Sequence, residues 1–448
     1  MSDFEKTWRD YCAQHGTPDR VELMLCDINA VLRGKWLPGE DIGKLTSGAA
    51  RLPISTYTPC ILGWEVEATG QGIVVGDPDG ILTPVASTLA PVPWADGNVA
   101  QVLVEMKDAT GEIGESSTRQ MLSKVVDRFV AKGLKPVVAT ELEFYIVKAR
   151  GAADEAPTPP DRLPDAQNYD LEVLGRHAAM LEEIKEAAKQ QGLPTDTLIA
   201  EYGPGQFEIN FHHTDDVLAA ADTTLVFRRL VRMVASKHGY EATFMAKPYA
   251  QHPGNGMHAH VSLVDEAGTN VLAADTPGGL SDTMRHAIAG TLVTMRDLQA
   301  IFAPHLNSYR RFQPKSFAPS APEWGFDHRA AAIRLPETSG KAARLEHRIC
   351  GADVNPYLAL AAILAGILYG LENKPDLQLE IDHPDARPQP LLTQDWATSV
   401  DAFAGSSIAS DIFGAAFRDL YAIVRREEIA ELTTVISPVE FSAYLSRL

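Results

Sequence analysis

Four segments of this chain alternate apolar with charged residues, and this alternation constrains the fold more than any other feature. The segments are VVATELEFYIV (137–147), QFEINFH (206–212), GMHAHVSLV (256–264) and ARLEHRI (343–349). A β-strand points successive side chains to opposite faces of its sheet, so residues i and i+2 share a face. Each segment therefore predicts a strand with one apolar face and one face of Glu, His or Arg. Four such strands in one domain indicate a sheet whose polar face encloses something charged.

The residues on these polar faces are of the types that bind metal ions and phosphate. The spacing pairs Glu141 with Glu143 and His258 with His260, aligns Arg344 with Glu346 and Arg348, sets Glu208 beside Asn210, and lets a Gly-Pro-Gly turn fold Glu201 back toward Glu208. Several carboxylates with an imidazole suit Mg²⁺ or Mn²⁺ better than a structural zinc ion. Arginine grips phosphate or carboxylate through two parallel hydrogen bonds. Taken singly, each motif is more often an exposed strand face or a surface ion-pair ladder, so only the combination favours such a site.

The remaining pattern predicts two domains of mixed secondary structure. A chain of 448 residues is long enough for more than one core. From Val21 to about Met106, short apolar runs broken by Gly, Pro and Asp predict a small, sheet-rich domain. At Ser117 the pattern becomes helical, with Thr118 as the expected cap. Further helices are expected over 173–192, 216–238 and 281–303, and a Pro-rich surface loop over 149–168. Helices spaced irregularly between the strands indicate an α+β domain.

Charge and composition exclude several classes of protein. A formal net charge of −19 and the lack of a Lys/Arg-dense block argue against nucleic-acid binding. The four cysteines show no C-x-x-C spacing, which indicates reduced thiols. The N-terminus does not resemble a signal peptide, and the apolar run 357–369 is too short to span a bilayer and predicts a buried helix. We therefore expect a soluble, cytoplasmic protein without a membrane partner. A phosphate-binding G-x-x-x-x-G-K-[ST] loop is also missing.

Over nearly its whole length the chain resembles the glutamine synthetase superfamily. The matching segments are Asp27-Ile-Asn-Ala with Arg33-Gly-Lys35, Glu141-Leu-Glu143-Phe, Gly203-Pro-Gly-Gln-Phe-Glu208, Gly256-Met-His258-Ala-His260, Asn307-Ser-Tyr-Arg-Arg311, Arg329 with Arg334, Lys341-Ala-Ala-Arg344-Leu-Glu346-His-Arg348 and Asn355-Pro-Tyr. Within the superfamily the chain looks most like the γ-glutamylputrescine synthetase branch. The resemblance implies an N-terminal β-grasp domain (1–112) and a C-terminal catalytic domain (113–448) with a curved antiparallel sheet flanked by helices.

The resemblance also implies a role for each matched residue. Metal ligands would be Glu143, Glu201 and Glu208 for one ion and Glu141, His258 and Glu346 for another, with two or three Mg²⁺ or Mn²⁺ ions in each site. ATP, the co-substrate, would contact His260, Arg329, Arg334, Lys341 and Arg344, and glutamate would contact Gly254, His258, Arg311 and Arg348. The residues expected to act directly in catalysis are Arg329, Arg348 and Glu208. The implied reaction transfers the γ-phosphoryl group of ATP to the side-chain carboxylate of glutamate, after which an amine attacks.

Two departures from the family pattern concern the amine. Where ammonia-using members carry an aspartate in the N-terminal domain, this chain has Tyr57, close to Trp64. Where they carry a glutamate in a mobile loop, the segment Lys315-Ser-Phe317-Ala-Pro319 supplies Phe317. The candidates for the amine site are Tyr57, Trp64, Tyr169, Glu201 and Phe317. Aromatic rings in place of carboxylates favour a larger, partly apolar amine, unless an offset neighbour such as Glu65 or Glu323 takes over either role.

The leading hypothesis is thus a ligase that joins glutamate to an organic amine, either a polyamine or a monoamine. The alternatives are glutamine synthetase itself, with ammonia as the acceptor, and a catalytically inert relative. The inert relative is disfavoured because all six implied metal ligands are present, and buried carboxylates without a cation are costly. The family's usual assembly, a homododecamer of two stacked hexameric rings, is implied by resemblance alone. In such a ring Tyr57 would reach into the site of an adjoining subunit.

Overall fold

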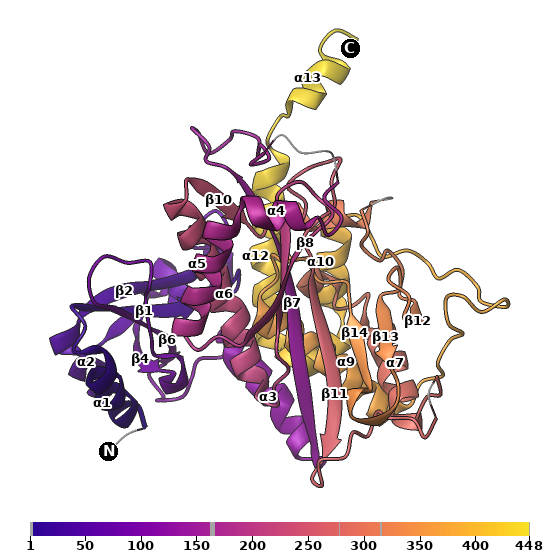
Figure 1. The fold of residues 1–448 in the computed structure, drawn as a ribbon, viewed down its shortest axis with the longest axis horizontal. Coiled ribbons are helices and arrows are strands. Elements are labelled where there is room, and N and C mark those ends of the chain that lie inside the picture. Colours follow the sequence, from indigo (N-terminus) through magenta and orange to yellow (C-terminus); the bar gives the residue numbers. More distant parts are fainter. Residues whose placement is uncertain (1–2, 162–165, 277, 314–315, 448) are drawn as a thin grey trace.

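The computed structural model of the chain describes residues 3–161, 166–276, 278–313 and 316–447. Two sheets organise it, one in the N-terminal quarter and one in the remainder (Figure 1). The last strand of the first sheet ends at Lys107 and the next helix begins at Thr118. The expected α+β fold class is confirmed, whereas a domain boundary between residues 112 and 113 stays a prediction.

The N-terminal sheet has six strands in the order β2-β1-β6-β4-β3, with β5 also paired to β6. Their bounds are β1 Arg20–Cys26, β2 Leu32–Pro38, β3 Arg51–Pro53, β4 Asp79–Pro84, β5 Ala90–Pro91 and β6 Val99–Lys107. The central strands β1 and β6 run parallel, and the other pairs are antiparallel. Helix α1 (Asp3–His15) adds Phe4 and Tyr11 to the buried core of this sheet, and the short helix α2 (Gly43–Thr46) adds Leu45.

The C-terminal sheet has eight strands in the order β12-β13-β14-β11-β7-β9-β8, with β10 paired to β7. Their bounds are β7 Leu134–Lys148, β8 Thr195–Ala200, β9 Gln206–Phe211, β10 Tyr240–Thr243, β11 Met257–Asp265, β12 Trp324–Phe326, β13 Ile333–Glu337 and β14 Arg344–His347. All pairs are antiparallel except β12 with β13. The four alternating segments thus form β7, β9, β11 and β14, adjacent strands of one sheet, as the sequence predicted.

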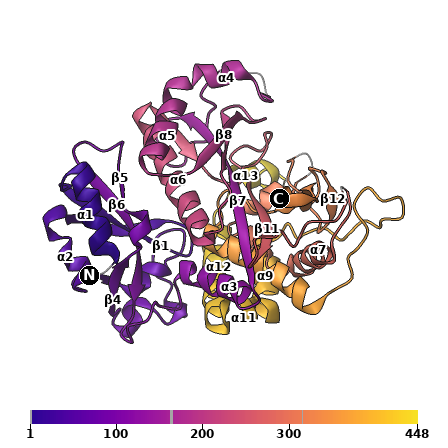
Figure 2. The same cartoon turned by 60° about the horizontal axis from the view of Figure 1, so that its bottom comes forward.

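Helices cover the apolar face of this sheet and extend beyond it (Figures 1 and 2). Their bounds are α3 Thr118–Val130, α4 Leu171–Arg176, α5 Ala178–Gln190, α6 Val217–Lys237, α7 Asp282–Thr294, α8 Gln299–Phe302, α9 Pro356–Asn373, α10 Trp396–Gly405, α11 Ser407–Phe413, α12 Ala415–Thr433 and α13 Pro438–Tyr444. The C-terminal helix α13 projects away from the body (Figure 1). Helix α9 is apolar enough to pass a test for a membrane span, but 78% of that window is buried inside the fold, so the predicted buried helix is confirmed.

Three local predictions about helices need correction. Ser117, not Thr118, caps α3, because its side chain accepts a hydrogen bond from the Gln120 N–H. The helix expected over 173–192 is two helices, interrupted where His177 leaves helical geometry and its buried ring contacts Asp161 at 2.9 Å. The helix expected over 281–303 likewise ends at Thr294, and α8 begins only at Gln299. Tertiary contacts of this kind override helical periodicity.

Candidate active site

The polar face of the C-terminal sheet opens into a cavity of about 920 Å³. Cavities of this volume enclose small-molecule ligands. The predicted site residues that line it are Glu141, Glu143, Tyr169, Glu201, Glu208, Gly254, His258, Arg311, Phe317, Arg329, Arg334 and Arg348. The sheet therefore brings together twelve positions that are spread along more than 200 residues of the chain.

Strand register places the acidic and imidazole side chains opposite one another. Glu143 of β7 faces Glu208 of β9, and Glu141 faces His258 of β11. On the far side of β11, His260 faces Glu346 of β14. Residues directly opposite each other in a sheet lie close enough for their side chains to interact. The alternation seen in the sequence thus becomes one continuous polar surface across four strands.

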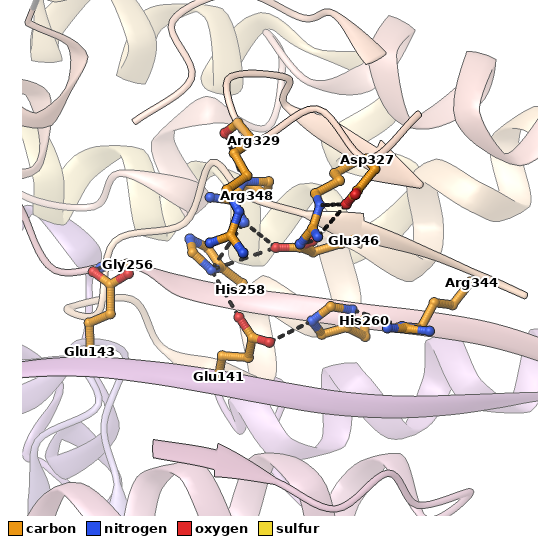
Figure 3. A network of polar contacts seen from close by, with 11 residues as sticks. Glu141, Glu143, Gly256, His258, His260, Asp327, Arg329, Arg344, Glu346 and Arg348 are labelled. Atoms are coloured by element: carbon orange, nitrogen blue, oxygen red, sulfur yellow. Dashed lines mark hydrogen bonds and ion pairs between the residues drawn. The ribbon is translucent and has the colours of Figure 1, made fainter. Parts of the chain in front are cut away.

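Hydrogen bonds connect Glu141 to both histidines (Figure 3). Its two oxygens lie 3.2 Å from His258 Nδ1 and 2.9 Å from His260 Nε2. Burial alone would raise the pKa of Glu141, but these two imidazole contacts outweigh it and lower the pKa. Burial also lowers the pKa of His258, helped by the nearby Arg348. Glu141 is therefore an ionised carboxylate beside an imidazole, a pair of groups that can both bind a cation.

The neighbouring carboxyls Glu143, Glu201 and Glu208 repel one another. Burial, followed by the charge of Glu201, raises the pKa of Glu143 to about 8. Burial and then the charges of Glu141, Glu143 and Glu201 raise the pKa of Glu208 to about 10. Burial is also the main cause of the raised pKa of Glu201. Carboxyls held this close together favour a cation between them, because the cation removes the repulsion and the need for protons.

Single ligand atoms from these residues converge in two groups. Atoms of Glu141, Glu208 and His258 lie within 4.8 Å of one another, and so do atoms of Glu141, His260 and Glu346. The donor set is mostly oxygen with imidazole nitrogen and no thiolate, which fits Mg²⁺ or Mn²⁺. The second group contains His260, which the family resemblance assigned to ATP and not to a metal ion. How the six residues divide between metal ions stays a prediction.

Arginines approach the same carboxylates from β13 and from the residue that follows β14. Glu346 is fully buried and accepts a hydrogen bond from Arg334 Nη1 at 2.9 Å. It also accepts one from Arg348 Nη1 (Figure 3). Burial opposes ionisation of Glu346, but the charges of His258 and Arg348 lower its pKa. Arg334 also contacts Asp327, whose exposed carboxylate accepts from Arg334 Nε at 3.0 Å. Guanidinium groups in this position offer fixed donors to a phosphate group.

A close backbone approach positions Arg311, the expected glutamate-binding residue. Arg311 lies in the short 3₁₀ segment Ser308–Phe312 and donates to the Ile349 carbonyl at 2.8 Å. A Cβ atom on Gly254 would lie 2.4 Å from the Ala246 carbonyl oxygen and 2.7 Å from Arg311 Cγ. Glycine at position 254 therefore leaves the space that Arg311 occupies.

The Gly-Pro-Gly turn brings Glu201 to the cavity, as the sequence predicted. The turn joins β8 to β9, and the Glu201 N–H donates to the Gln206 carbonyl at 2.9 Å. A Cβ atom on Gly203 would lie 1.8 Å from the Tyr145 hydroxyl, so only glycine fits there. Gln167, which sequence reasoning missed, fastens the turn by donating to the carbonyls of Glu201 and Gln206 at 3.1 and 3.0 Å. No local pattern marks Gln167, because its partners lie more than 30 residues away.

Other predicted residues lie outside the cavity lining. Lys341 is exposed, and Arg344 donates to His260 Nδ1 at 3.3 Å from the rim of the sheet. Tyr57 does not line this cavity, because its side chain is only 3% exposed in the N-terminal core, and its expected place in the site of an adjoining subunit stays a prediction. The Tyr57 hydroxyl accepts a hydrogen bond from the Met106 N–H at 2.8 Å. Trp64 is 45% exposed on the N-terminal unit.

Neither offset carboxylate replaces the missing acids among the described residues of the cavity. Glu65 accepts hydrogen bonds from the Ser55 hydroxyl and the Ile73 N–H. Glu323 accepts from the Gln389 N–H at 3.1 Å. Neither residue lines the cavity of its own chain, so a role for either in amine binding stays a prediction. Lys315 of the expected mobile loop lies outside the described residues.

The outer end of the cavity is aromatic. Tyr169 and Phe317 line it as expected, and Tyr202 lines it as well. The rings of Tyr202 and Phe317 lie with their centroids 5.1 Å apart at an interplanar angle of 59°. Tyr202 was missed by sequence reasoning, although its place directly after Glu201 in a tight turn was a usable signal.

Comparison with known proteins agrees with this geometry. The family described as "Glutamine synthetase, catalytic domain" matches residues 115–444. The γ-glutamylputrescine synthetase of Escherichia coli is 36% identical, with 98% of this chain and 94% of that protein covered. The glutamate–isopropylamine ligase of a Pseudomonas species is 34% identical, with 98% of this chain and 97% of that protein covered. A solved complex of GmaS with ADP superposes with a TM-score of 0.86 at 26% identity, covering 100% of both chains.

The chain therefore belongs to the glutamine synthetase family. Enzymes of this family are ATP-dependent and use divalent metal ions, and the chain is an ATP-dependent carboxylate–amine ligase acting on small molecules. The oxygen-rich donor set at the inner end of the cavity agrees with that metal requirement.

Proposed function

We propose that this enzyme joins glutamate to an organic amine and forms a γ-glutamylamide by way of γ-glutamyl phosphate. The observation that carries the proposal is the aromatic outer end of the cavity, where Phe317 packs on Tyr202. The named substrates of the two relatives, putrescine and isopropylamine, are both organic amines. An ammonium ion would find no carboxylate at this end among the described lining residues other than Glu201.

In this proposal the buried carboxyls hold the metal ions. One ion is held by Glu143, Glu201 and Glu208, and a second by Glu141, His258 and Glu346. A third ion in the same site is compatible with this proposal. Bound Mg²⁺ or Mn²⁺ supplies charge stabilisation for phosphate oxygens. Without that cation the raised pKa values of Glu143 and Glu208 keep protons on these carboxyls, so metal binding is coupled to proton release.

The arginines orient the two substrates that react first. The carboxylates of the glutamate substrate are bound by Arg311 and Arg348, and Gly254 leaves the space that Arg311 occupies. Arg329 and Arg334 bind phosphate oxygens of ATP, assisted at the rim by His260, Arg344 and Lys341. Arg348 contacts both Glu346 and His258, so it links the metal-binding residues to the glutamate substrate. Holding the phosphoryl donor and the carboxylate in line lowers the barrier by orientation and by electrostatics.

Ammonia is the second candidate acceptor, because it is the substrate of glutamine synthetase itself. A panel of amines decides between the two, with glutamate and ATP fixed and phosphate release measured. We expect organic amines to exceed ammonium in kcat/KM by at least about 10-fold. Ammonium ahead of every organic amine would contradict the proposal. No metal-dependent turnover with any amine would indicate an inert relative.

We further propose a homododecamer of two stacked hexameric rings, located in the cytoplasm. Large apolar side chains are exposed in two places that suit subunit contacts, the loop 61–75 of the N-terminal unit and the terminal helix α13. All four cysteines are free, which suits a reducing compartment. Sedimentation of the purified enzyme tests the assembly: a mass near twelve chains is expected, and a monomer contradicts it.

A further inference from the structure

Two aromatic rings form a wall at the outer end of the cavity. The side chains of Tyr202 and Phe317 are 41% and 65% exposed, and they contact each other at a centroid separation of 5.1 Å. Both residues line the cavity that also contains the buried glutamates. Aromatic surface of this size gains free energy when carbon covers it. The wall is therefore suited to bind an apolar group.

The backbone around this wall is held in an unfavourable conformation. Phe317 has φ of +60°, and the consecutive residues Asn168 and Tyr169 have φ of +43° and +68°. These values are uncommon for residues other than glycine and cost free energy that surrounding contacts must offset. Ser316 supplies such contacts, because its hydroxyl donates to the carbonyls of Arg311 and Gln313. All three of these residues line the cavity, so the unfavourable backbone conformation occurs at the cavity wall.

The aromatic wall directly adjoins an acid. Tyr202 follows Glu201 in the chain, and its N–H donates to Glu201 Oε2 at 3.3 Å. Two backbone hydrogen bonds join the segment 167–169 to the segment 200–202. The Gln167 N–H donates to the Tyr202 carbonyl, and the Tyr169 N–H donates to the Ala200 carbonyl. An amine whose nitrogen approaches Glu201 would therefore extend its carbon substituent along the rings.

Four carboxylates line the described part of the cavity, and Glu201 is the one that adjoins the aromatic wall. Among the described residues that line it, the acidic ones are Glu141, Glu143, Glu201 and Glu208. The lining also contains neutral side chains, among them Ile199, Leu391 and Gln394. A second ammonium group packed against the rings would lose water without gaining a carboxylate partner other than Glu201, which the reacting nitrogen approaches.

We propose that Tyr202, with Phe317, determines acceptor specificity by packing on the carbon substituent of a primary monoamine. This inference rests on the proposed function and narrows it from organic amines to apolar monoamines. Tyr202 is a specificity residue: its ring touches the substituent, while the reacting nitrogen lies at Glu201. Diamines of the same length bind less well.

A matched pair of substrates tests the acceptor class in the full-length enzyme. n-Butylamine and 1,4-diaminobutane differ only at the far end of the chain, where the diamine carries a second ammonium group. We expect kcat/KM for n-butylamine to exceed that for the diamine by about 10-fold or more. A diamine that equals or exceeds n-butylamine overturns the proposal, because it requires a carboxylate at the outer end. If glutamate supports no turnover with any amine, the proposed function fails instead.

Two variants test the role of Tyr202. Tyr202→Ala removes the ring, so kcat/KM for n-butylamine should fall about 10-fold while kcat/KM for ammonium and KM for glutamate change less than about 2-fold. Tyr202→Phe keeps the ring and is the matched control, which should retain the preference for n-butylamine. Equal losses for n-butylamine and ammonium in Tyr202→Ala, at an unchanged melting temperature, would overturn the assignment. A melting temperature that falls together with both rates would do so too, since it assigns Tyr202 a purely structural role.

Discussion

The two ends of the central cavity are built by different means. The inner end lies on strands β7, β9, β11 and β14, where Glu, His and Arg side chains are buried and paired in register. The outer end lies on loops, where exposed rings are held by backbone in the left-handed region. Strands fix side chains to within a fraction of an ångström, whereas loops vary without disturbing a core. The difference assigns phosphoryl chemistry to the inner end and the choice of amine to the outer end.

The largest expected effect follows from neutralising one inner carboxyl. Glu208→Gln keeps the shape of the side chain but removes a charge proposed to hold metal and to act in catalysis, so kcat/KM should fall at least about 100-fold. In the absence of metal, the same variant should be more stable than the parent enzyme. The buried Glu208 carboxyl of the parent has a raised pKa, which costs stability at neutral pH. Because the variant lacks this carboxyl, its free energy of unfolding should be higher by about 1 kcal/mol or more. Kinetics and thermal melting in the presence of a chelator measure both.

Glu241→Gln is the matched control on the same sheet, since Glu241 forms an exposed ion pair with Arg150. We expect less than about a 2-fold change in activity and less than about 0.5 kcal/mol in stability. If Glu208→Gln loses stability along with activity, the inner end is a structural network and the contrast between the two ends disappears.

Adding one methyl group beside Arg311 should give the next largest effect. In Gly254→Ala the new Cβ would approach the Ala246 carbonyl oxygen and Arg311 Cγ far inside contact distance. Overpacking of this kind costs about 1–3 kcal/mol, and displacement of Arg311 should raise KM for glutamate about 10-fold while leaving the ranking of amines unchanged. Gly175→Ala on helix α4 is the control, because an added Cβ meets nothing within 4 Å there. Equal effects on glutamate and amine kinetics would show that the two ends are not separable.

The response of stability to pH should also distinguish the ends. The folded-state pKa of Glu143 is raised to about 8 from an ordinary value of 4.5, so the metal-free folded state binds more protons than the unfolded chain between these values. Metal-free stability should therefore fall as pH rises from about 4.5 to 8, by up to about 1.4 kcal/mol per pH unit for each such proton. Added Mn²⁺ should displace the protons and raise the melting temperature more at pH 8 than at pH 6. A larger metal-induced rise at pH 6 would contradict the proposed ligands.

Sequence periodicity predicted the inner end far better than the outer end. The i and i+2 spacing of Glu141 with Glu143, and of His258 with His260, was enough to predict their shared face, because strand geometry is nearly invariant. The outer end depends on contacts between distant loops, such as Gln167 with the Glu201 turn, which no local pattern encodes. Tyr57 lies in the core of the N-terminal sheet and not in the cavity of its own chain. Its family position implies the site of an adjoining subunit, so its role stays a prediction.

Asp327 is a loop residue that contacts the strand-built inner end through Arg334, and the effect of changing it should be the smallest. It has left-handed backbone with φ of +45°, and its exposed carboxylate binds Arg334, which also contacts buried Glu346. Because an exposed ion pair contributes about 0–1 kcal/mol, Asp327→Asn should raise KM for ATP only about 2- to 5-fold and leave KM for amines unchanged. Asp382→Asn, which alters a neighbouring exposed contact to His328, is the control. An effect on amine kinetics alone would show that Arg334 acts in acceptor binding and not in phosphate binding. Because Arg334 lies on strand β13, the strands could then no longer be assigned to the chemistry and the loops to the choice of amine.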